Sequence, residues 1–333
     1  MNNLRKVGIS ALAGSLAAFS AHAVEMTASG SAKVTYYNNN TDEVTGNPFG
    51  MNTSISFSGS GDVNGYETTL VITNNDANSG LSSASLSVDM GDMGKVTFDQ
   101  GVGVGGLSTI DDKLPSAYEE SWDSIDAAAT TSSNGLVGMA NSGVFVYSNT
   151  IADNSVTAQF GKGQSTANSD DAVGGVSGHG TSWDFAVTNS SLSDGLTVGA
   201  GYGSISNGNG DKKEASDDSD EHMTAFATYA VGPVTLGYQQ SHREDNTIGG
   251  TPETATSYGV AINLMEGLSV SYNDREIEFA KAGSSHVTED ATGVALSYTM
   301  GSAKIAIQQN ESDNNDGGTS SDESTEIALS LSF

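Results

Sequence analysis

Acidic side chains gather in one long stretch of the chain that lacks regular alternation. The segment from residue 101 to residue 140 separates two alternating runs and contains several acids with a single base. A segment of this length without strand periodicity is usually functional or disordered. Carboxylates at a narrow point of an aqueous passage would select solutes by charge and width. The residues that could do so are Asp111, Asp112, Lys113, Glu119, Glu120, Asp123 and Asp126.

Outside this insert, apolar and polar residues alternate along most of the chain. From Met26 to Tyr36 the apolar or small residues share one parity, and Ile327, Leu329 and Phe333 do the same at the other end. A period of two places each parity on its own face of a β-strand. We predict sixteen strands, near residues 25–37, 51–59, 66–74, 84–90, 94–100, 141–149, 155–162, 181–189, 196–204, 222–231, 233–243, 256–264, 268–276, 291–299, 303–310 and 325–333.

The connections between these strands alternate strictly between short turns and longer polar loops. Antiparallel neighbours place alternate connections at opposite ends of a sheet, so the short turns share one end and the long loops the other. This pattern, with an even number of strands, is typical of outer-membrane barrels. An open sheet of this size would leave two unpaired edges, which closure removes. The predicted fold class is an all-β, transmembrane antiparallel barrel of sixteen strands.

The N-terminus has the features of a secretory signal peptide. Arg5 and Lys6 precede an apolar stretch, and Ala21-His22-Ala23 fits a cleavage site, so we expect residues 1–23 to be removed and residues 24–333 to form the barrel domain. Cleavage would change the net charge from −29 to −31. A chain this acidic is a poor partner for nucleic acid. The chain has no cysteine, so disulfides do not stabilise it.

The strand from Gly94 to Gln100, the insert behind it and the terminal Phe333 resemble the general bacterial porins, most closely the alphaproteobacterial type. The resemblance implies a homotrimer of barrels in the outer membrane of a Gram-negative bacterium. It also implies that the third long loop, residues 101–140, folds into the lumen, and that Phe333 is a recognition signal for assembly. The implied function is passive diffusion of small hydrophilic solutes and ions.

In such porins, acids of the third loop face bases on the barrel wall. Strand parity predicts four lumen-facing bases on the wall of this chain, with Arg243 as a further candidate near the outer rim. The four are Lys33, Lys95, Arg275 and Lys304. Because bases are few, we expect an acid-dominated constriction and a preference for cations. The alternative for any single acid is a solvated loop charge.

Other functions have weaker support in the sequence. Residues 101–106 resemble a dinucleotide loop only superficially, because no helix pattern follows. Ser241 and His242 are adjacent on a predicted strand and would point to opposite faces, which argues against an outer-membrane lipid hydrolase. We expect no enzyme, cofactor or metal centre; weak Ca²⁺ binding by the acidic loops near 211–221 and 313–317 is the alternative to solvated loops. A surface structural protein or adhesin with a plugged lumen is the alternative function.

Overall fold

A computed structural model describes residues 25–39, 47–75, 83–103, 105–123, 125, 142–162, 181–206, 219–244, 252–280 and 287–333. The predicted signal peptide therefore lies outside the described residues. The strands are β1 (Glu25–Asn39), β2 (Phe49–Val63), β3 (Tyr66–Asn75), β4 (Ser83–Asp89), β5 (Lys95–Gln100), β6 (Ser142–Ile151), β7 (Asn154–Gly161), β8 (Ser182–Asn189), β9 (Leu196–Ser206), β10 (Ser219–Val231), β11 (Val234–Glu244), β12 (Glu253–Met265), β13 (Leu268–Phe279), β14 (Val287–Met300), β15 (Ala303–Asp313) and β16 (Ser321–Ser332). Short 3₁₀ turns are η1 (Gly91–Met93), η2 (Gly106–Thr109) and η3 (Asn315–Gly317). In the described parts of the chain, no helix has the length and apolar character needed to cross a membrane.

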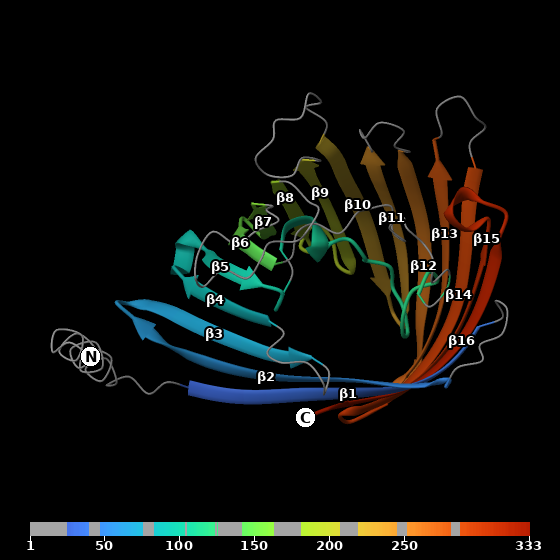
Figure 1. Ribbon diagram of the computed structural model, residues 1–333, viewed down its shortest axis with the longest axis horizontal. Coiled ribbons are helices and arrows are strands. Elements are labelled where there is room, and N and C mark those ends of the chain that lie inside the picture. The colour runs from blue at the N-terminus through green and yellow to red at the C-terminus, as the bar shows by residue number, and fades with distance from the viewer. Residues whose placement is uncertain are drawn as a thin grey trace, which may run out of the picture.

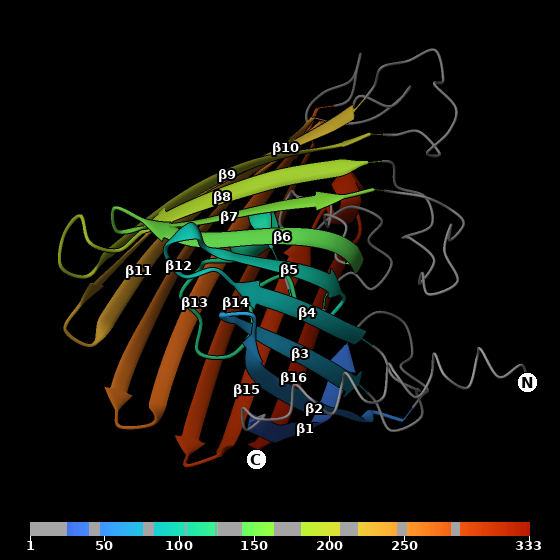
Figure 2. The same ribbon diagram turned by 90° about the vertical axis from the view of Figure 1, so that its left-hand side faces the viewer.

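The sixteen strands form one closed antiparallel barrel (Figures 1 and 2). Each strand pairs with its neighbours in the sequence, and β1 closes the barrel by pairing with β16, with Tyr36 opposite Ile327. The terminal residue takes part, because Phe333 and Gly30 exchange two backbone hydrogen bonds of 2.8 and 2.9 Å. The prediction of a sixteen-stranded antiparallel barrel is confirmed, and so is the alternation of short and long connections.

The two faces of the barrel differ in chemistry, as the alternating pattern predicts. Large apolar side chains such as Phe57, Leu70 and Leu329 are exposed on the outer face, while residues of the other parity, such as Gln239 and Asn310, are buried polar groups on the inner face. Aromatic side chains pair on the outer face, as Phe98 and Phe145 do with ring centres 5.1 Å apart. An apolar exterior with aromatic pairs and a polar interior suits a barrel surrounded by lipid.

Several strands extend further towards the long loops than the alternation predicts. Strand β14 begins at Val287 rather than at 291, and β16 begins at Ser321 rather than at 325. The added residues are mainly polar on both parities, yet they continue the ladder, as the pairs of Glu278 with Thr288 and of Ser312 with Asp322 show. Backbone pairing therefore continues beyond the part of the strand whose outer face is apolar. A prediction based on alternating hydrophobicity places the strand end too early there.

Glycine closes the short turns where a side chain would not fit. At the turn between β8 and β9, Gly195 has φ of +77°, and a Cβ at this residue would lie 2.2 Å from the carbonyl oxygen of Ala230 on β10. An L-residue would therefore meet both a left-handed backbone and a steric clash. Such turns hold neighbouring strands in register at the end of the barrel opposite the long loops.

Candidate functional site: the insert and the inner wall

The described part of the insert runs along the inner wall of the barrel. Figure 1 shows it within the ring of strands. It begins at the end of β5, contacts β7 through Thr157, whose Oγ1 accepts a hydrogen bond of 3.0 Å from the Gly106 amide, and reaches β16 at Glu326. At Glu119 it also contacts β1, because the carboxylate lies 2.8 Å from Lys33 Nζ. The insert therefore follows the wall from β7 to β16 and on to β1.

Side-chain amides on alternate strands hold the backbone of the insert. The side chain of Gln239 on β11 donates to the carbonyls of Ile110 and Asp111, both at 2.9 Å, and accepts from the Lys113 amide at 2.8 Å. On β13, Asn273 donates to the Pro115 carbonyl at 3.2 Å. An irregular segment needs partners for its own N–H and C=O groups, and these inward amides supply them.

Strand β15 contributes a second pair of amides to the same task. Gln308 donates to the Glu120 carbonyl at 2.6 Å and accepts from the Glu119 amide at 3.0 Å. Asn310, which is 1% exposed, donates to the carbonyls of Glu120 and Asp123 at 3.0 and 2.7 Å. Residues 119 to 123 are thus held by four hydrogen bonds at three backbone groups, all from two neighbouring inward side chains.

Inward glycines make room for the insert. A Cβ at Gly237 on β11 would lie 2.2 Å from Pro115 Cδ, and a Cβ at Gly293 on β14 would lie 2.8 Å from the Cα of Ser121. Real Cβ atoms do not approach so closely, so the wall is flattened where the insert crosses it. The contact is close-packed, and a side chain at either position would displace the insert.

Apolar side chains of the insert turn towards the wall. Leu107 packs with Ile205, and Ile110 packs with Ala186 and Phe226, all within the barrel. Trp122 lies under the guanidinium group of Arg275, with the Arg275 carbon 5.3 Å from the ring centre. These contacts cover apolar area inside a polar lumen, which favours a docked insert over a solvated one.

The acids Glu119 and Asp123 of the insert each accept a short hydrogen bond from a nitrogen. The carboxylate of Glu119 accepts a hydrogen bond from Lys33, and Asp123 Oδ2 accepts one of 2.9 Å from the Glu120 amide. Asp126 lies outside the described residues. The paired charges of Glu119 and Lys33 offset each other, so this acid contributes less to the field in the lumen than its position in the sequence suggests.

The three remaining acids of the insert have raised pKa values because they are partly buried. Burial and the neighbouring Asp112 and Asp123 raise the pKa of Glu120 to about 9. Burial raises the pKa of Asp112 to about 6, although a hydrogen bond with Glu120 opposes the change. Burial also raises the pKa of Asp111. Glu120 is therefore mainly protonated at neutral pH, and it shares hydrogen bonds with Asp112 and Asp123 rather than carrying a full charge.

The four wall bases all lie on the inner parity, but in different surroundings. Lys304 lies 5.4 Å from the centre of the Tyr118 ring, and Lys33 lies 5.7 Å from it. Arg275 is 1% exposed and forms an ion pair with Glu289 on β14. Lys95 is exposed and lines the open part of the lumen. Three of the four bases are thus close to the insert, and Lys95 is separate from them.

Arg243 lies near the long-loop end of β11, at the outer rim. Its guanidinium group pairs with Asp220 at 3.2 Å and with Glu253 at 3.3 Å, on the two neighbouring strands. Both acids are buried, so these pairs join β10, β11 and β12 above the insert. We interpret this group as a link between three strands of the wall, since one guanidinium group pairs with an acid on each neighbouring strand.

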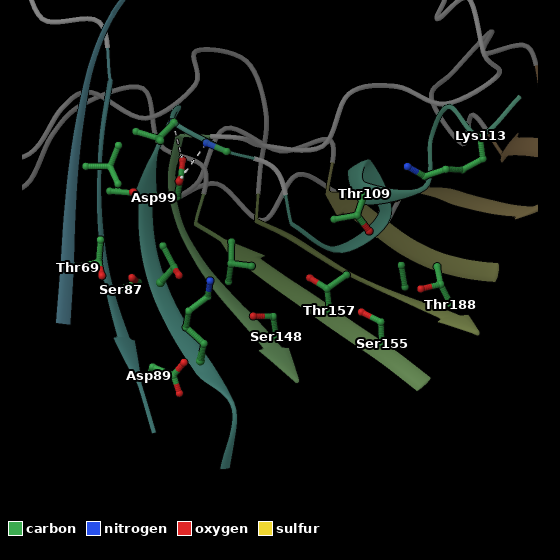
Figure 3. Close-up of a pocket in the computed structure, with 18 of the residues that line it drawn as sticks. Thr69, Ser87, Asp89, Asp99, Thr109, Lys113, Ser148, Ser155, Thr157 and Thr188 are labelled. Carbon is green, nitrogen blue, oxygen red and sulfur yellow. Dashed lines mark hydrogen bonds between the residues drawn. The ribbon is translucent and has the colours of Figure 1, made fainter. Parts of the chain in front are cut away.

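A cavity of about 890 Å³ remains open on the other side of the lumen. Figure 3 shows its wall, where hydroxyl side chains such as Ser87, Thr157 and Thr188 point inward. Among the charged residues of the insert, Lys113 lines this cavity, whereas its described acids do not. At the start of the insert, Asp99 also borders the cavity, but its carboxylate accepts hydrogen bonds from three successive amides, those of Gly101, Val102 and Gly103.

The amides and glycines that anchor the insert are not among the residues that sequence reasoning selected. Gln239, Asn273, Gln308 and Asn310 are ordinary polar residues on the inner parity, and glycine is common throughout the chain. A usable indication was present: inward glycines at 201, 237, 259 and 293 fall on strands β9, β11, β12 and β14. Such a row of glycines indicates that another segment lies against the wall.

The described residues give no support for a hydrolytic or metal site. Ser241 donates or accepts a hydrogen bond of 2.8 Å with Thr224 on the inner face, while His242 contacts Thr254 at 2.9 Å from the other side of the strand. Within the part of the chain that the structure describes, no three acids or histidines are arranged to hold a metal ion. Most of the acidic loop near 211–221, where weak Ca²⁺ binding is the alternative to a solvated loop, lies outside the described residues.

Comparisons with known proteins agree with this architecture. A sequence profile of the family described as Gram-negative porin matches residues 8–333. No curated protein sequence matches the chain. Similar solved structures include OmpT of Vibrio cholerae, an outer membrane protein in its trimer form (TM-score 0.66, 12% identity), and the anion-selective porin from Comamonas acidovorans (0.64, 13%). Another is a porin refined at 1.8 Å resolution (0.64, 14%). Each comparison covers 93% of this chain and 100% of the other.

A closed barrel with an apolar exterior, a polar interior and an open cavity defines a membrane channel. Because the family profile covers nearly the whole sequence, the chain belongs to the Gram-negative porin family. It is a passive diffusion channel of the bacterial outer membrane. The resemblance noted from the C-terminal strand and the insert is therefore confirmed at the level of the family.

Proposed function

We propose that this porin passes small hydrophilic solutes and ions with a preference for cations, and that its insert sets the width of the passage. The role of the insert rests on one observation: a row of hydrogen bonds to strands from β7 to β16 holds it along the inner wall. A segment held in this way reduces the cross-section available to a solute, and residues 111 to 126 form the narrow zone in this proposal.

The cation preference rests on the charge balance of the chain. It has 41 acids and 12 bases, and a channel whose walls carry excess negative charge concentrates cations. We further propose that the protein is a homotrimer, as one similar structure is, and that it has no enzymatic activity. In this proposal the mature chain begins at Val24, and Phe333 directs barrel assembly.

The test is electrical measurement on the purified protein in planar bilayers. An open trimeric porin should insert with current steps grouped in threes, and a KCl gradient should give a reversal potential of the sign expected for a cation-selective pore. A reversal potential of the opposite sign would contradict the cation preference alone. A barrel that produces no current at any voltage would contradict the channel itself.

A further inference from the structure

The open lumen lies against one side of the barrel, and the charges that border it are arranged differently from those of the insert. The insert is hydrogen bonded to strands from β7 to β16, with its acids beside Lys33, Tyr118 and its own backbone. The cavity borders β3 to β10, so the two sets of strands overlap only from β7 to β10. A solute that follows the cavity therefore meets the wall of β3, β4 and β5 on one side and the edge of the insert on the other.

The wall of this passage carries two acids and one base near the short-turn end. Glu67 on β3 is directly opposite Asp89 on β4, and Asp89 is directly opposite Lys95 on β5. All three side chains are exposed and line the cavity. With one base beside two acids, this part of the wall has a net negative charge, and exposed carboxylates act directly on ions that pass them.

The insert presents the opposite charge to the same cavity. Lys113 lines it, and Figure 3 shows Lys113 across the pocket from Asp89. The backbone amide of Lys113 donates a hydrogen bond of 2.8 Å to the Gln239 side chain, which fixes the position of the Lys113 backbone against the wall. Asp111, close by in the sequence, does not line the cavity.

We propose that the field along the passage is set by Lys113 on the insert and by Glu67 and Asp89 on the wall, rather than by the acids of the insert. This arrangement reverses the expected one, in which the loop is acidic and the wall is basic. The inference rests on the proposed function, because it assigns the charge selectivity of that channel to particular residues. Glu67, Asp89 and Lys113 are thus specificity-determining residues for ions.

Neutralising these groups tests the assignment. In water, a unit charge about 10 Å from the ion path changes the local concentration of a monovalent ion by about twofold. Each charge acts on K⁺ and Cl⁻ in opposite directions, so it changes their ratio by about fourfold. The double variant Glu67→Gln/Asp89→Asn should therefore lower the ratio of K⁺ to Cl⁻ permeability by about 16-fold at low salt, where screening is weak. Lys113→Gln should raise the ratio by about fourfold.

The matched control removes the same number of acids from the insert. Glu120→Gln/Asp123→Asn changes two carboxylates of the insert to amides, and it should lower the ratio less than Glu67→Gln/Asp89→Asn does. The proposal is overturned if this control shifts the ratio more than Glu67→Gln/Asp89→Asn does. Absence of current in the unmodified protein would instead contradict the proposed function, so the two failures are distinguishable.

Labelling of introduced cysteines locates the passage independently, because the cysteine substitutions themselves do not alter the charge of the wall. The chain has no cysteine, so a single introduced thiol is the only target for a thiol reagent. Ser87 lines the cavity, whereas Ser271 is 4% exposed beneath the insert, where its hydroxyl accepts a hydrogen bond from the Ala117 amide. A positively charged methanethiosulfonate reagent should reduce the current through Ser87→Cys and leave Ser271→Cys unchanged. If the reagent modified Ser271→Cys as fast as Ser87→Cys, or faster, the proposal that ions pass along β3, β4 and β5 would be overturned.

Discussion

Asn310 offers the sharpest test of how the insert is held. Replacement by alanine removes two hydrogen bonds, to the carbonyls of Glu120 and Asp123, and a third of 3.0 Å that its Oδ1 accepts from Gln308. The Glu120 carbonyl keeps its bond from Gln308, whereas the Asp123 carbonyl loses the Asn310 donor. A lost hydrogen bond costs about 1 kcal/mol, and a buried group left without a partner costs about 1–3 kcal/mol.

The expected total is about 2–4 kcal/mol against docking of residues 119 to 123, with little effect on the barrel itself. At the lower value the fraction of undocked insert rises about 30-fold. Amide hydrogen exchange reports this equilibrium directly, so the amides of residues 119 to 123 should exchange faster by that factor, while those of β15 should not. The channel should also show larger fluctuations in its open current.

The matched control is Gln309→Ala on the same strand. This side chain points to the outer face, where it donates to Glu323 at 2.9 Å, so it should affect neither exchange in the insert nor the current. Equal protection of residues 119 to 123 in Asn310→Ala and the unmodified protein would refute the view that inward amides hold the insert in place.

Three further predictions concern the same contacts. The pKa of Glu120 in the docked insert is about 9, above its usual value of 4.5. Protonated Glu120 therefore favours docking fully below pH 4.5, and this contribution to docking stability is lost as the pH rises towards 9. Asp112, with a pKa of about 6, adds a similar loss at lower pH. Exchange of the insert's amides, corrected for intrinsic rates, should therefore show weaker protection at pH 9 than at pH 5, and Glu120→Gln should remove most of that difference. Gly237→Ala should destabilise the docked insert by about 1–3 kcal/mol, because the new Cβ would lie 2.2 Å from Pro115 Cδ. Amide exchange of the insert, followed as the temperature rises, measures this loss of stability. Unchanged protection would show that Pro115 moves aside at no cost. Gly30→Ala should slow barrel closure, since a Cβ there would lie 2.5 Å from the Phe333 ring. Heat-modifiability on gels measures the fraction of folded barrel, and each single variant should lower it. The double variant with Phe333→Ala should lower it by less than the sum of the two single effects, because the clash is then absent.

Alternation was sufficient to predict the barrel because each strand faces lipid on one side and water on the other. The outward residues Ile327 and Leu329 on β16 and Leu70 on β3 follow this rule, and parity needs no knowledge of distant contacts. Strand ends near the long loops were predicted less well. At Thr288 and Ser321 the backbone keeps pairing although the added residues are mainly polar, so hydrophobic alternation no longer reports the strand.

The contacts within the lumen could not be predicted from local sequence. Glu119 and Lys33 are separated by 86 positions, and their 2.8 Å contact depends on how the insert crosses the barrel. The raised pKa values of Asp112 and Glu120 likewise depend on burial that no local pattern reports. Counting charges therefore overstates the field of the insert, because some of its acids are paired or protonated.

Uptake of uncharged solutes into liposomes tests the central claim, a passive channel narrowed by the insert, most directly. Proteoliposomes transferred to solutions of sugars of increasing size should swell at rates that fall steeply with solute size and do not saturate with concentration, without any energy source. In Asn310→Ala the swelling rate should fall less steeply with solute size than in the unmodified protein. Liposomes that admit no sugar of any size, although the barrel is folded and inserted, would contradict the account.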